Sequence, residues 1–166
     1  MKRYRPEAST SALDPARERR KVLVMERLAQ YLIVPPGPGD ATALAEVQVR
    51  AWRETYPGLI PSAYLARMSA PVQAERWRRT LNRPHAGDVT LALEGVNQIA
   101  GYCSGAVGYG EAEIFTLYLL SEVQGRGLGA HLFQAVARAL GAGGAETLDV
   151  WVLNGNHRAM GFYARL

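Results

Sequence analysis

A glycine-rich loop between an apolar strand and an apolar helix is the stretch whose residue types point most directly to chemistry. It runs from Gln124 to Gly129 and holds three glycines around Arg126. The first N–H groups of a helix have no partner inside it, and the helix dipole favours an anion there. Glycine lets a ligand approach the backbone without a Cβ in the way, and arginine keeps its charge at any physiological pH. The pattern predicts a site for a phosphate-bearing ligand, with a ligand-free glycine turn as the alternative.

The spacing of the glycines distinguishes this loop from two other types of anion-binding loop. A nucleotide-hydrolysing P-loop ends in Gly-Lys-Ser/Thr, whereas this loop ends in Gly-Leu-Gly. A dinucleotide fingerprint needs G-x-G-x-x-G, which Gly125, Gly127 and Gly129 do not provide. The pattern that fits is Gln-x-x-Gly-x-Gly, formed by Gln124, Gly127 and Gly129.

Two elements must hold this loop in place. Residues 113–120 are apolar and rich in aromatic and β-branched types, which predicts a buried strand. After the loop, apolar residues recur at helical spacing, which predicts a helix from about residue 127 to 140 that ends at a glycine cluster. Those residues are Leu128, Leu132, Val136 and Leu140.

The rest of the chain is predicted to alternate between helices and strands. Expected strands cover residues 21–28, 31–34, 89–93, 99–107 and 146–152. Expected helices cover residues 40–55, 61–68, 71–81 and 156–166. With 166 residues the chain suits one α/β domain with a sizeable core.

Composition limits the class of protein and its compartment. Hydrophobic residues make up 48% and charged residues 20%, an ordinary globular balance, and no apolar run approaches the roughly 18 residues of a membrane-spanning helix. The basic, polar N-terminus does not resemble a secretory signal, and the single cysteine, Cys103, suits a reducing cytoplasm. We therefore expect a cytoplasmic protein without a membrane partner.

Charge and histidine placement give expectations about partners. The net charge is +4, which suits a polyanionic cofactor, and no basic motif interleaved with aromatics predicts nucleic acid binding. His85, His131 and His157 show no metal-ligand spacing, so we expect no metal.

Three ordered stretches together resemble the GNAT N-acetyltransferase superfamily. They are the glycine loop, the segment 51–65 (AWRETYPGLIPSAYL) and the segment 156–163 (NHRAMGFY), and the resemblance covers roughly residues 31–166. It implies a GNAT-like α/β fold with a mixed, mostly antiparallel sheet flanked by helices. It also implies an enzyme that transfers an acetyl group from acetyl-CoA to a primary amine by direct attack.

The resemblance assigns a role to the residues of the central strand and loop. The loop would hold the pyrophosphate of acetyl-CoA. The pantetheine arm would pair with backbone groups of Leu117, Tyr118 and Leu119, which are exposed where the central strand splays from the next strand. An N–H near Leu119 would polarise the thioester carbonyl. Asn156 would bind the pantetheine, or cap a helix, or both. The full cofactor-binding set is Leu117, Tyr118, Leu119, Gln124, Gly125, Arg126, Gly127, Leu128, Gly129 and Asn156.

The same resemblance implies the catalytic groups. Tyr163 would be the acid that protonates the departing thiolate, and Glu113 would be the base that works through water, with Glu111 and Glu54 as alternatives. Tyr56 and Trp52 are candidates for the acceptor side.

The chain departs from the family at its C-terminal end. The family normally continues past Phe-Tyr into a two-strand hairpin, whereas this sequence stops at Leu166. Segments 3–6 and 21–28 resemble that hairpin, so we expect residues 1–30 to form an extension that replaces it. The replacement would act within the chain, as a circular permutation, or in a partner subunit, as a strand-swapped homodimer.

Other functions and several acceptors stay open from sequence. The main alternative is a non-catalytic acyl-CoA-binding regulatory module, and a third is a nucleic-acid-binding protein that uses the basic surface. The acceptor amine is a small molecule or a peptide: a protein N-terminus, a polyamine, an amino acid and an aminoglycoside all fit.

Overall fold

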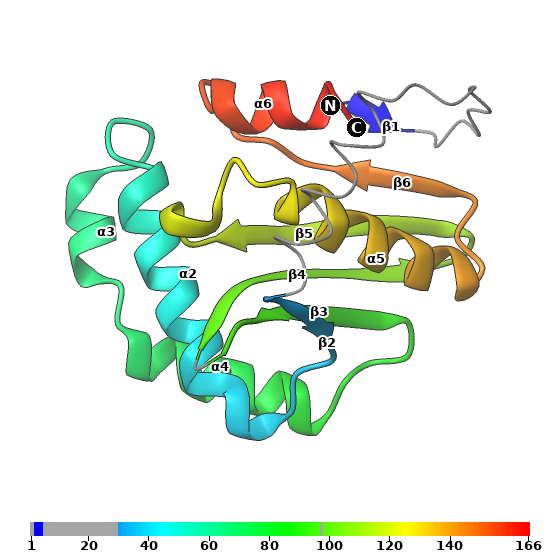
Figure 1. The fold of residues 1–166 in the computed structure, drawn as a ribbon, viewed down its shortest axis with the longest axis horizontal. Coiled ribbons are helices and arrows are strands. Elements are labelled where there is room, and N and C mark those ends of the chain that lie inside the picture. Colours follow the sequence, from blue (N-terminus) through cyan, green and yellow to red (C-terminus); the bar gives the residue numbers. More distant parts are fainter. Residues whose placement is uncertain (1, 5–29, 97) are drawn as a thin grey trace.

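A single twisted sheet with helices on both faces forms the core of the computed structural model, which describes residues 2–4, 30–96 and 98–166 (Figure 1). The strands are β1 (Lys2–Tyr4), β2 (Leu32–Val34), β3 (Asp88–Glu94), β4 (Ile99–Gly108), β5 (Glu111–Leu119) and β6 (Thr147–Val150). The helices are α2 (Ala41–Thr55), α3 (Ser62–Arg67), α4 (Ala70–Asn82), α5 (Leu128–Ala142) and α6 (His157–Tyr163). Short 3₁₀ turns span Pro38–Asp40 and Ser121–Val123.

The strand order is β1-β6-β5-β4-β3-β2, and one of the neighbouring pairs is parallel. That pair is β5 and β6, which α5 connects, and the other described pairs are antiparallel. Helix α5 crosses the sheet beside β3, β4 and β5, as expected for the crossover between parallel strands (Figure 1).

The two faces of the sheet carry different helices. On one face, the rings of Tyr102 and Tyr118 lie 5.7 Å apart and contact Trp77 of α4 and Trp52 of α2. Because side chains alternate along a strand, Cys103 and the residues opposite it in the adjacent strands, Leu91 and Leu117, point to the other face, which α5 and α6 cover.

The predicted elements of the described residues are observed with shifts of a few residues at their ends. The predicted strand at 21–28 lies outside the described residues. Strand β1, however, pairs antiparallel with the outer edge of β6, with Lys2 opposite Val150 and Tyr4 opposite Leu148. The replacement of the family's C-terminal hairpin by residues 1–30, in one chain or between two, stays a prediction.

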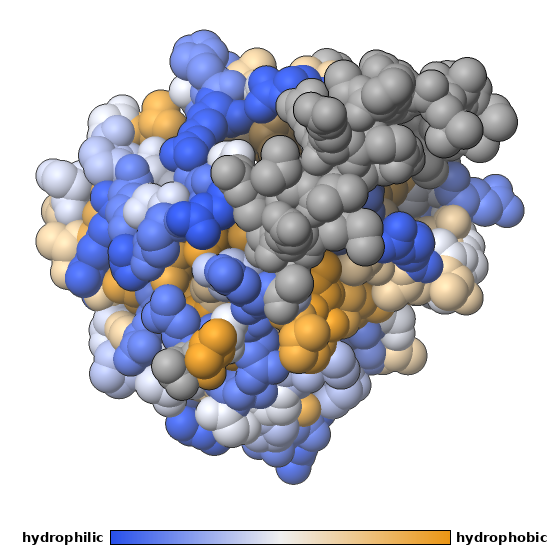
Figure 2. Space-filling model, in the orientation of Figure 1, coloured by the Kyte–Doolittle hydropathy of each residue, from blue (hydrophilic) through white to orange (hydrophobic). Residues whose placement is uncertain are grey.

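In the view of Figure 2, hydrophilic residues cover much of the surface and apolar residues reach it near the middle. None of the described helices is long and apolar enough to span a bilayer. Among the described residues, no group of three histidine, cysteine or carboxylate side chains is placed to hold a metal ion.

A β-bulge interrupts the pairing of β4 with β5 in the middle of the sheet. Ser104 lies opposite Thr116 and Gly105 lies opposite Ile114, so Phe115 is an extra residue without a partner in β4. Gly105 is required here by close approach, because a Cβ at this position would collide with the backbone oxygen of Glu113.

We predict that Gly105→Ala lowers the free energy of unfolding by about 2 kcal/mol, because the added methyl forces the two central strands apart at the bulge. Urea denaturation measures the effect. Gly108→Ala in the same strand is the matched control, since a Cβ there meets no atom within 4 Å. Equal midpoints for the two variants would contradict the close-packing argument.

Candidate active site

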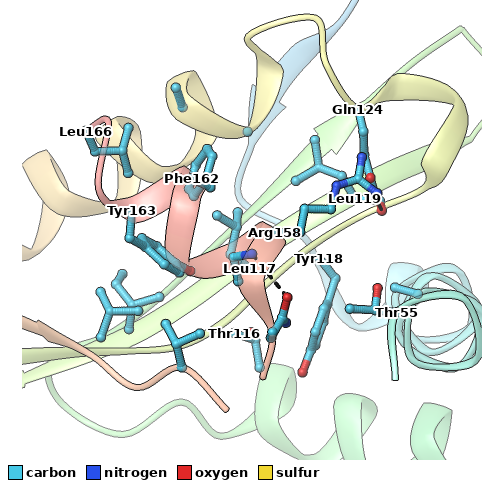
Figure 3. Close-up of a pocket in the computed structure, with 18 of the residues that line it drawn as sticks. Thr55, Thr116, Leu117, Tyr118, Leu119, Gln124, Arg158, Phe162, Tyr163 and Leu166 are labelled. Carbon is cyan, nitrogen blue, oxygen red and sulfur yellow. Dashed lines mark hydrogen bonds between the residues drawn. The ribbon is translucent and has the colours of Figure 1, made fainter. Parts of the chain in front are cut away.

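A pocket of about 580 Å³ opens beside β5, between the glycine loop and helices α2 and α6 (Figure 3). Figure 3 shows Phe162 and Tyr163 on the α6 side of β5, and Tyr118 and Thr55 on the α2 side. Eight of the ten residues predicted to bind the cofactor line this pocket, and the structure therefore brings them together. They are Leu117, Tyr118, Leu119, Gln124, Gly125, Gly127, Gly129 and Asn156.

The pocket exists because two parallel strands part. Pairing of β5 with β6 ends at Ile114 and Val150, while β5 continues to Leu119. The strand segment beyond Ile114 keeps β4 on one side and faces the pocket on the other. The expected splay is therefore present at the centre of the sheet.

Backbone direction along β5 determines which groups face the gap. The N–H of Leu120 donates to the carbonyl of Ala100 in a 2.9 Å hydrogen bond, so the backbone groups of Leu120 point to β4. Because this direction alternates in a strand, the backbone groups of Tyr118 also face β4 and those of Leu117 and Leu119 face the gap. Tyr118 thus contributes its side chain to the pocket rather than its backbone.

Gln124 ties the loop to the strand. Its side-chain Nε2 donates a 2.6 Å hydrogen bond to the backbone carbonyl of Leu119. This bond satisfies the acceptor of Leu119 and leaves its N–H as the donor at that point of the gap. It also fixes the distance between the strand and the start of the glycine loop.

The glycine loop has the geometry of an anion site. Gly125 and Gly127 have φ angles of 72° and 83°, a left-handed region that side chains other than glycine rarely adopt. Among the described residues, no carbonyl accepts a hydrogen bond from the N–H groups of Gly125, Arg126 or Gly127, and α5 begins directly afterwards. These donors and the helix dipole favour a phosphate.

The two other loop residues of the predicted set lie elsewhere. Arg126 is exposed and does not line the pocket, although its charge lies on the same loop. Leu128 is 1% exposed and packs in the hydrophobic core, where it anchors the first turn of α5.

Tyr163 lines the pocket from α6, with its hydroxyl directed toward the interior in Figure 3. Its ring makes edge contacts with Phe133 and Phe162 at centroid distances of 5.8 and 5.0 Å. Burial raises the pKa of the Tyr163 hydroxyl well above its usual value, with smaller contributions from Cys103 and Tyr56. The phenol is therefore fully protonated at neutral pH, as a proton donor must be.

A second phenol borders the gap from the opposite face. Burial, and then the neighbouring Tyr56, raise the pKa of Tyr118. Tyr56 itself lines the pocket, and Trp52 supports both rings from behind at centroid distances of 5.1 Å from Tyr56 and 6.4 Å from Tyr118. Of the two expected acceptor-side aromatics, Tyr56 reaches the cavity and Trp52 packs beneath it.

Asn156 caps α6, which is one of its two predicted roles, and its binding to the pantetheine stays a prediction. Its Oδ1 accepts a 3.1 Å hydrogen bond from the N–H of Ala159, which caps α6, and the residue is 8% exposed. It also lines the pocket, so its amide lies at the wall beside the gap.

The candidate bases lie outside the lining of the pocket. Glu113 precedes Phe115 by two residues on β5, with Ala106 and Asp149 as its strand neighbours. Glu111 starts the same strand and is exposed. Glu54 is engaged on the surface of α2 by Arg50, at 2.9 Å. The structure does not bring any of the three to Tyr163, and Glu113 is the nearest along β5 to the gap.

Sequence reasoning missed several lining residues. They include Thr55, Thr116, Trp151, Arg158 and Arg165. Arg158 and Arg165 had one available signal, since Arg158 lies within segment 156–163 and Arg165 follows it by two residues, and both carry a positive charge. Trp151 has no comparable signal, because its place depends on where β6 leaves β5.

Comparison with known proteins agrees with this geometry. The model of the acetyltransferase (GNAT) family matches residues 47–166. The chain belongs to the GNAT family. The uncharacterized N-acetyltransferase YuaI of Bacillus subtilis is 31% identical over 123 residues, which cover 70% of this chain and 68% of that protein. The predicted family and enzyme class are thereby confirmed: the protein is a GNAT N-acetyltransferase.

Solved structures confirm the fold of this GNAT enzyme. The PaiA N-acetyltransferase of Thermoplasma acidophilum, in complex with coenzyme A, has a TM-score of 0.70 at 19% identity and covers 81% of this chain and 87% of its own. An acetyltransferase of Thermus thermophilus has a TM-score of 0.57 at 25% identity, with coverage of 82% and 84%. The gap between β5 and β6 and the loop N–H groups that no described carbonyl pairs with fit an extended cofactor that ends in phosphates.

We predict that Gln124→Ala weakens acetyl-CoA binding about fivefold to tenfold, because the bond that spaces the loop from Leu119 is lost. Isothermal titration measures the dissociation constant. Gln134→Ala, on the exposed side of α5, is the control and leaves binding unchanged. If Gln124→Ala binds like the control, Gln124 does not position the loop.

Proposed function

We propose that this GNAT enzyme transfers the acetyl group of acetyl-CoA to a primary amine by direct attack, without an acetylated protein intermediate. The observation that carries the proposal is the gap between β5 and β6, which ends at the glycine loop and has a protonated phenol in its wall. Binding in the gap positions the thioester beside the acceptor, and such positioning is a large part of the catalysis of a two-substrate reaction.

In the proposed reaction, Leu119, Tyr163 and Glu113 each stabilise a charge or transfer a proton. The N–H of Leu119 donates to the thioester carbonyl oxygen and stabilises the negative charge that develops there as the amine nitrogen bonds to the carbonyl carbon. When the carbon–sulfur bond breaks, the hydroxyl of Tyr163 donates its proton to the departing thiolate. Glu113 accepts the amine's proton through water, and solvent returns a proton to Tyr163.

The test of this function is binding followed by turnover on one sample. Isothermal titration with acetyl-CoA and with CoA comes first, and release of free thiol is then measured across a panel of amines. We expect acetyl-CoA binding and thiol release with one class of amine. Binding of acetyl-CoA without thiol release on any amine would contradict the enzymatic function and favour a regulatory acyl-CoA-binding module.

Tyr163→Phe separates catalysis from binding. We expect kcat to fall about 100-fold, as for the loss of a general acid, with the acetyl-CoA dissociation constant unchanged because the ring remains. Since the pKa of Tyr163 is raised, the wild type loses no activity through its deprotonation up to at least about pH 10. Stopped thiol-release assays from pH 6 to 10 measure both effects.

Tyr31→Phe is the control for the loss of a hydroxyl, because Tyr31 also packs against the core and lies away from the pocket. Wild-type kcat in Tyr163→Phe would exclude Tyr163 as the acid.

Glu113→Gln tests the base. We expect kcat/KM at pH 7 to fall about tenfold or more, and the loss to shrink as the pH approaches the pKa of the amine, where the neutral amine needs no base. Glu111→Gln on the same strand is the matched control. A loss in Glu111→Gln with none in Glu113→Gln would move the role to Glu111.

A further inference from the structure

A second pocket, of about 240 Å³, lies on the α4 face of the sheet and adjoins the first. Its wall includes Arg76, Trp77, Asp88, Ser104 and Phe115. Phe115 lines both pockets. The hydroxyls of Ser104 and Thr116 form a 2.6 Å hydrogen bond, and Thr116 lines the first pocket. One thin wall, made by the bulge of β5, therefore separates the two spaces.

Phe115 is an unusual residue for this wall. It belongs to the strand at the centre of the enzyme, yet its side chain is 56% exposed because the bulge leaves it without a partner in β4. An exposed ring between two cavities offers an apolar surface to a molecule that extends from one into the other. The acceptor is such a molecule, because its amine must reach the gap while the rest of it lies outside.

The free charge in the second pocket belongs to Arg76. Its neighbours on α4, Arg78 and Arg79, are both engaged by Glu75, at 2.7 and 3.0 Å. Within the described part of the chain, the guanidinium of Arg76 makes no hydrogen bond or ion pair. The pocket's own carboxylate, Asp88, accepts a 2.8 Å hydrogen bond from the N–H of His85 and so closes a turn.

Two other polar groups of the second pocket already form hydrogen bonds within the protein. Trp77 donates its indole N–H to Gln48, at 3.0 Å, and the Thr80 hydroxyl donates to the carbonyl of Arg76, at 3.2 Å. What remains toward the cavity is a planar cation with several N–H donors, a geometry that matches a carboxylate.

The charges around this cation indicate where the acceptor's own charges fall. Asp88 lies opposite Ala106, and Ala106 lies opposite Glu113, so Glu113 and Asp88 share this face of the sheet. Asp88 lines the second pocket and Glu113 lies outside the lining of the first, while the exposed Arg76 supplies the free cation in the wall of the second pocket. A polycationic acceptor that reached into this pocket would place one of its charges near Arg76, which would repel it.

We propose that the acceptor is an amino-carboxylate, whose amine enters the gap beside Phe115 and whose carboxylate, several bonds away, binds Arg76. This rests on the proposed acetyl transfer and names the substrate class for it. Polyamines and aminoglycosides are accordingly poor acceptors.

The test compares acceptors that share one amine and differ in one charge. The probes are the dipeptide amides Ala-Glu, Ala-Gln and Ala-Lys, each as the C-terminal amide. We expect kcat/KM to be about tenfold higher for Ala-Glu than for Ala-Gln, and lowest for Ala-Lys. In Arg76→Gln the advantage of Ala-Glu over Ala-Gln disappears through a rise in KM, with kcat unchanged.

Arg79→Gln is the matched control, since Arg79 lies one turn along α4, pairs with Glu75 and does not line the pocket. It retains the preference for Ala-Glu. Equal kcat/KM for Ala-Glu and Ala-Gln in the wild type, or an unchanged preference in Arg76→Gln, overturns the proposal.

A binding measurement separates this proposal from the proposed function. Isothermal titration of the CoA-saturated protein with the three peptides requires no turnover. Tight Ala-Glu binding that Arg76→Gln weakens about tenfold supports the carboxylate site, even if thiol release fails and the proposed acetyl transfer falls. No difference between Ala-Glu and Ala-Gln in this titration overturns the site, even if both are acetylated.

Discussion

The site depends on the point where the only parallel pair among the described strands stops pairing. A strand in the centre of a sheet normally satisfies its N–H and C=O groups on both edges, and a buried group without a partner costs about 1–3 kcal/mol. Beyond Ile114, β5 has that partner on one edge only. The backbone of Leu117 and the N–H of Leu119 are therefore open to the pocket, where water or an extended ligand can pair with them. The glycine loop and the lining residues of α2 and α6 are arranged around this opening.

The bulge at Phe115 and the hydrogen bond of Gln124 keep β5 and β6 apart beyond Ile114. The bulge at Phe115 adds a residue to β5 where the gap begins, and a bulge increases the local twist of its strand. At the far end, Gln124 occupies the carbonyl of Leu119, which would otherwise be free to pair with a neighbouring strand. The rings of Tyr118 and Tyr163 border the gap from the two faces of the sheet. Their hydroxyls stay protonated because burial disfavours the phenolate and raises the pKa of each. Neutral hydrogen-bond donors along β5 and in the two tyrosines suit a reaction in which charge appears on the substrate and then disappears.

The sequence predicted the elements well, and it named eight residues that the fold gathers around one pocket. The strand 113–120 and the helix after the loop have strong, simple periodicities, and the order Gln-x-x-Gly-x-Gly marks the loop itself. Placement across the sheet was harder, because it depends on register. Tyr118 was expected to offer its backbone, but which residues of a strand face the gap depends on one hydrogen bond, from Leu120 to Ala100. Trp151 and the bulge at Phe115 likewise follow from where pairing begins and ends, which composition and periodicity do not encode.

The bulge links the two substrates of the reaction. A regular strand places alternate side chains on opposite faces, and each residue lies opposite one residue of the neighbouring strand. One extra residue breaks this alternation, exposes Phe115, and brings Thr116 beside the first pocket while its hydroxyl bonds Ser104 in the wall of the second. The same irregularity that helps to open the gap thus also forms part of the wall of the second pocket, where we propose that the acceptor binds. A change at the bulge therefore alters both sites together, whereas a change at Arg76, at the far side of the second pocket, can alter the choice of acceptor without affecting the gap.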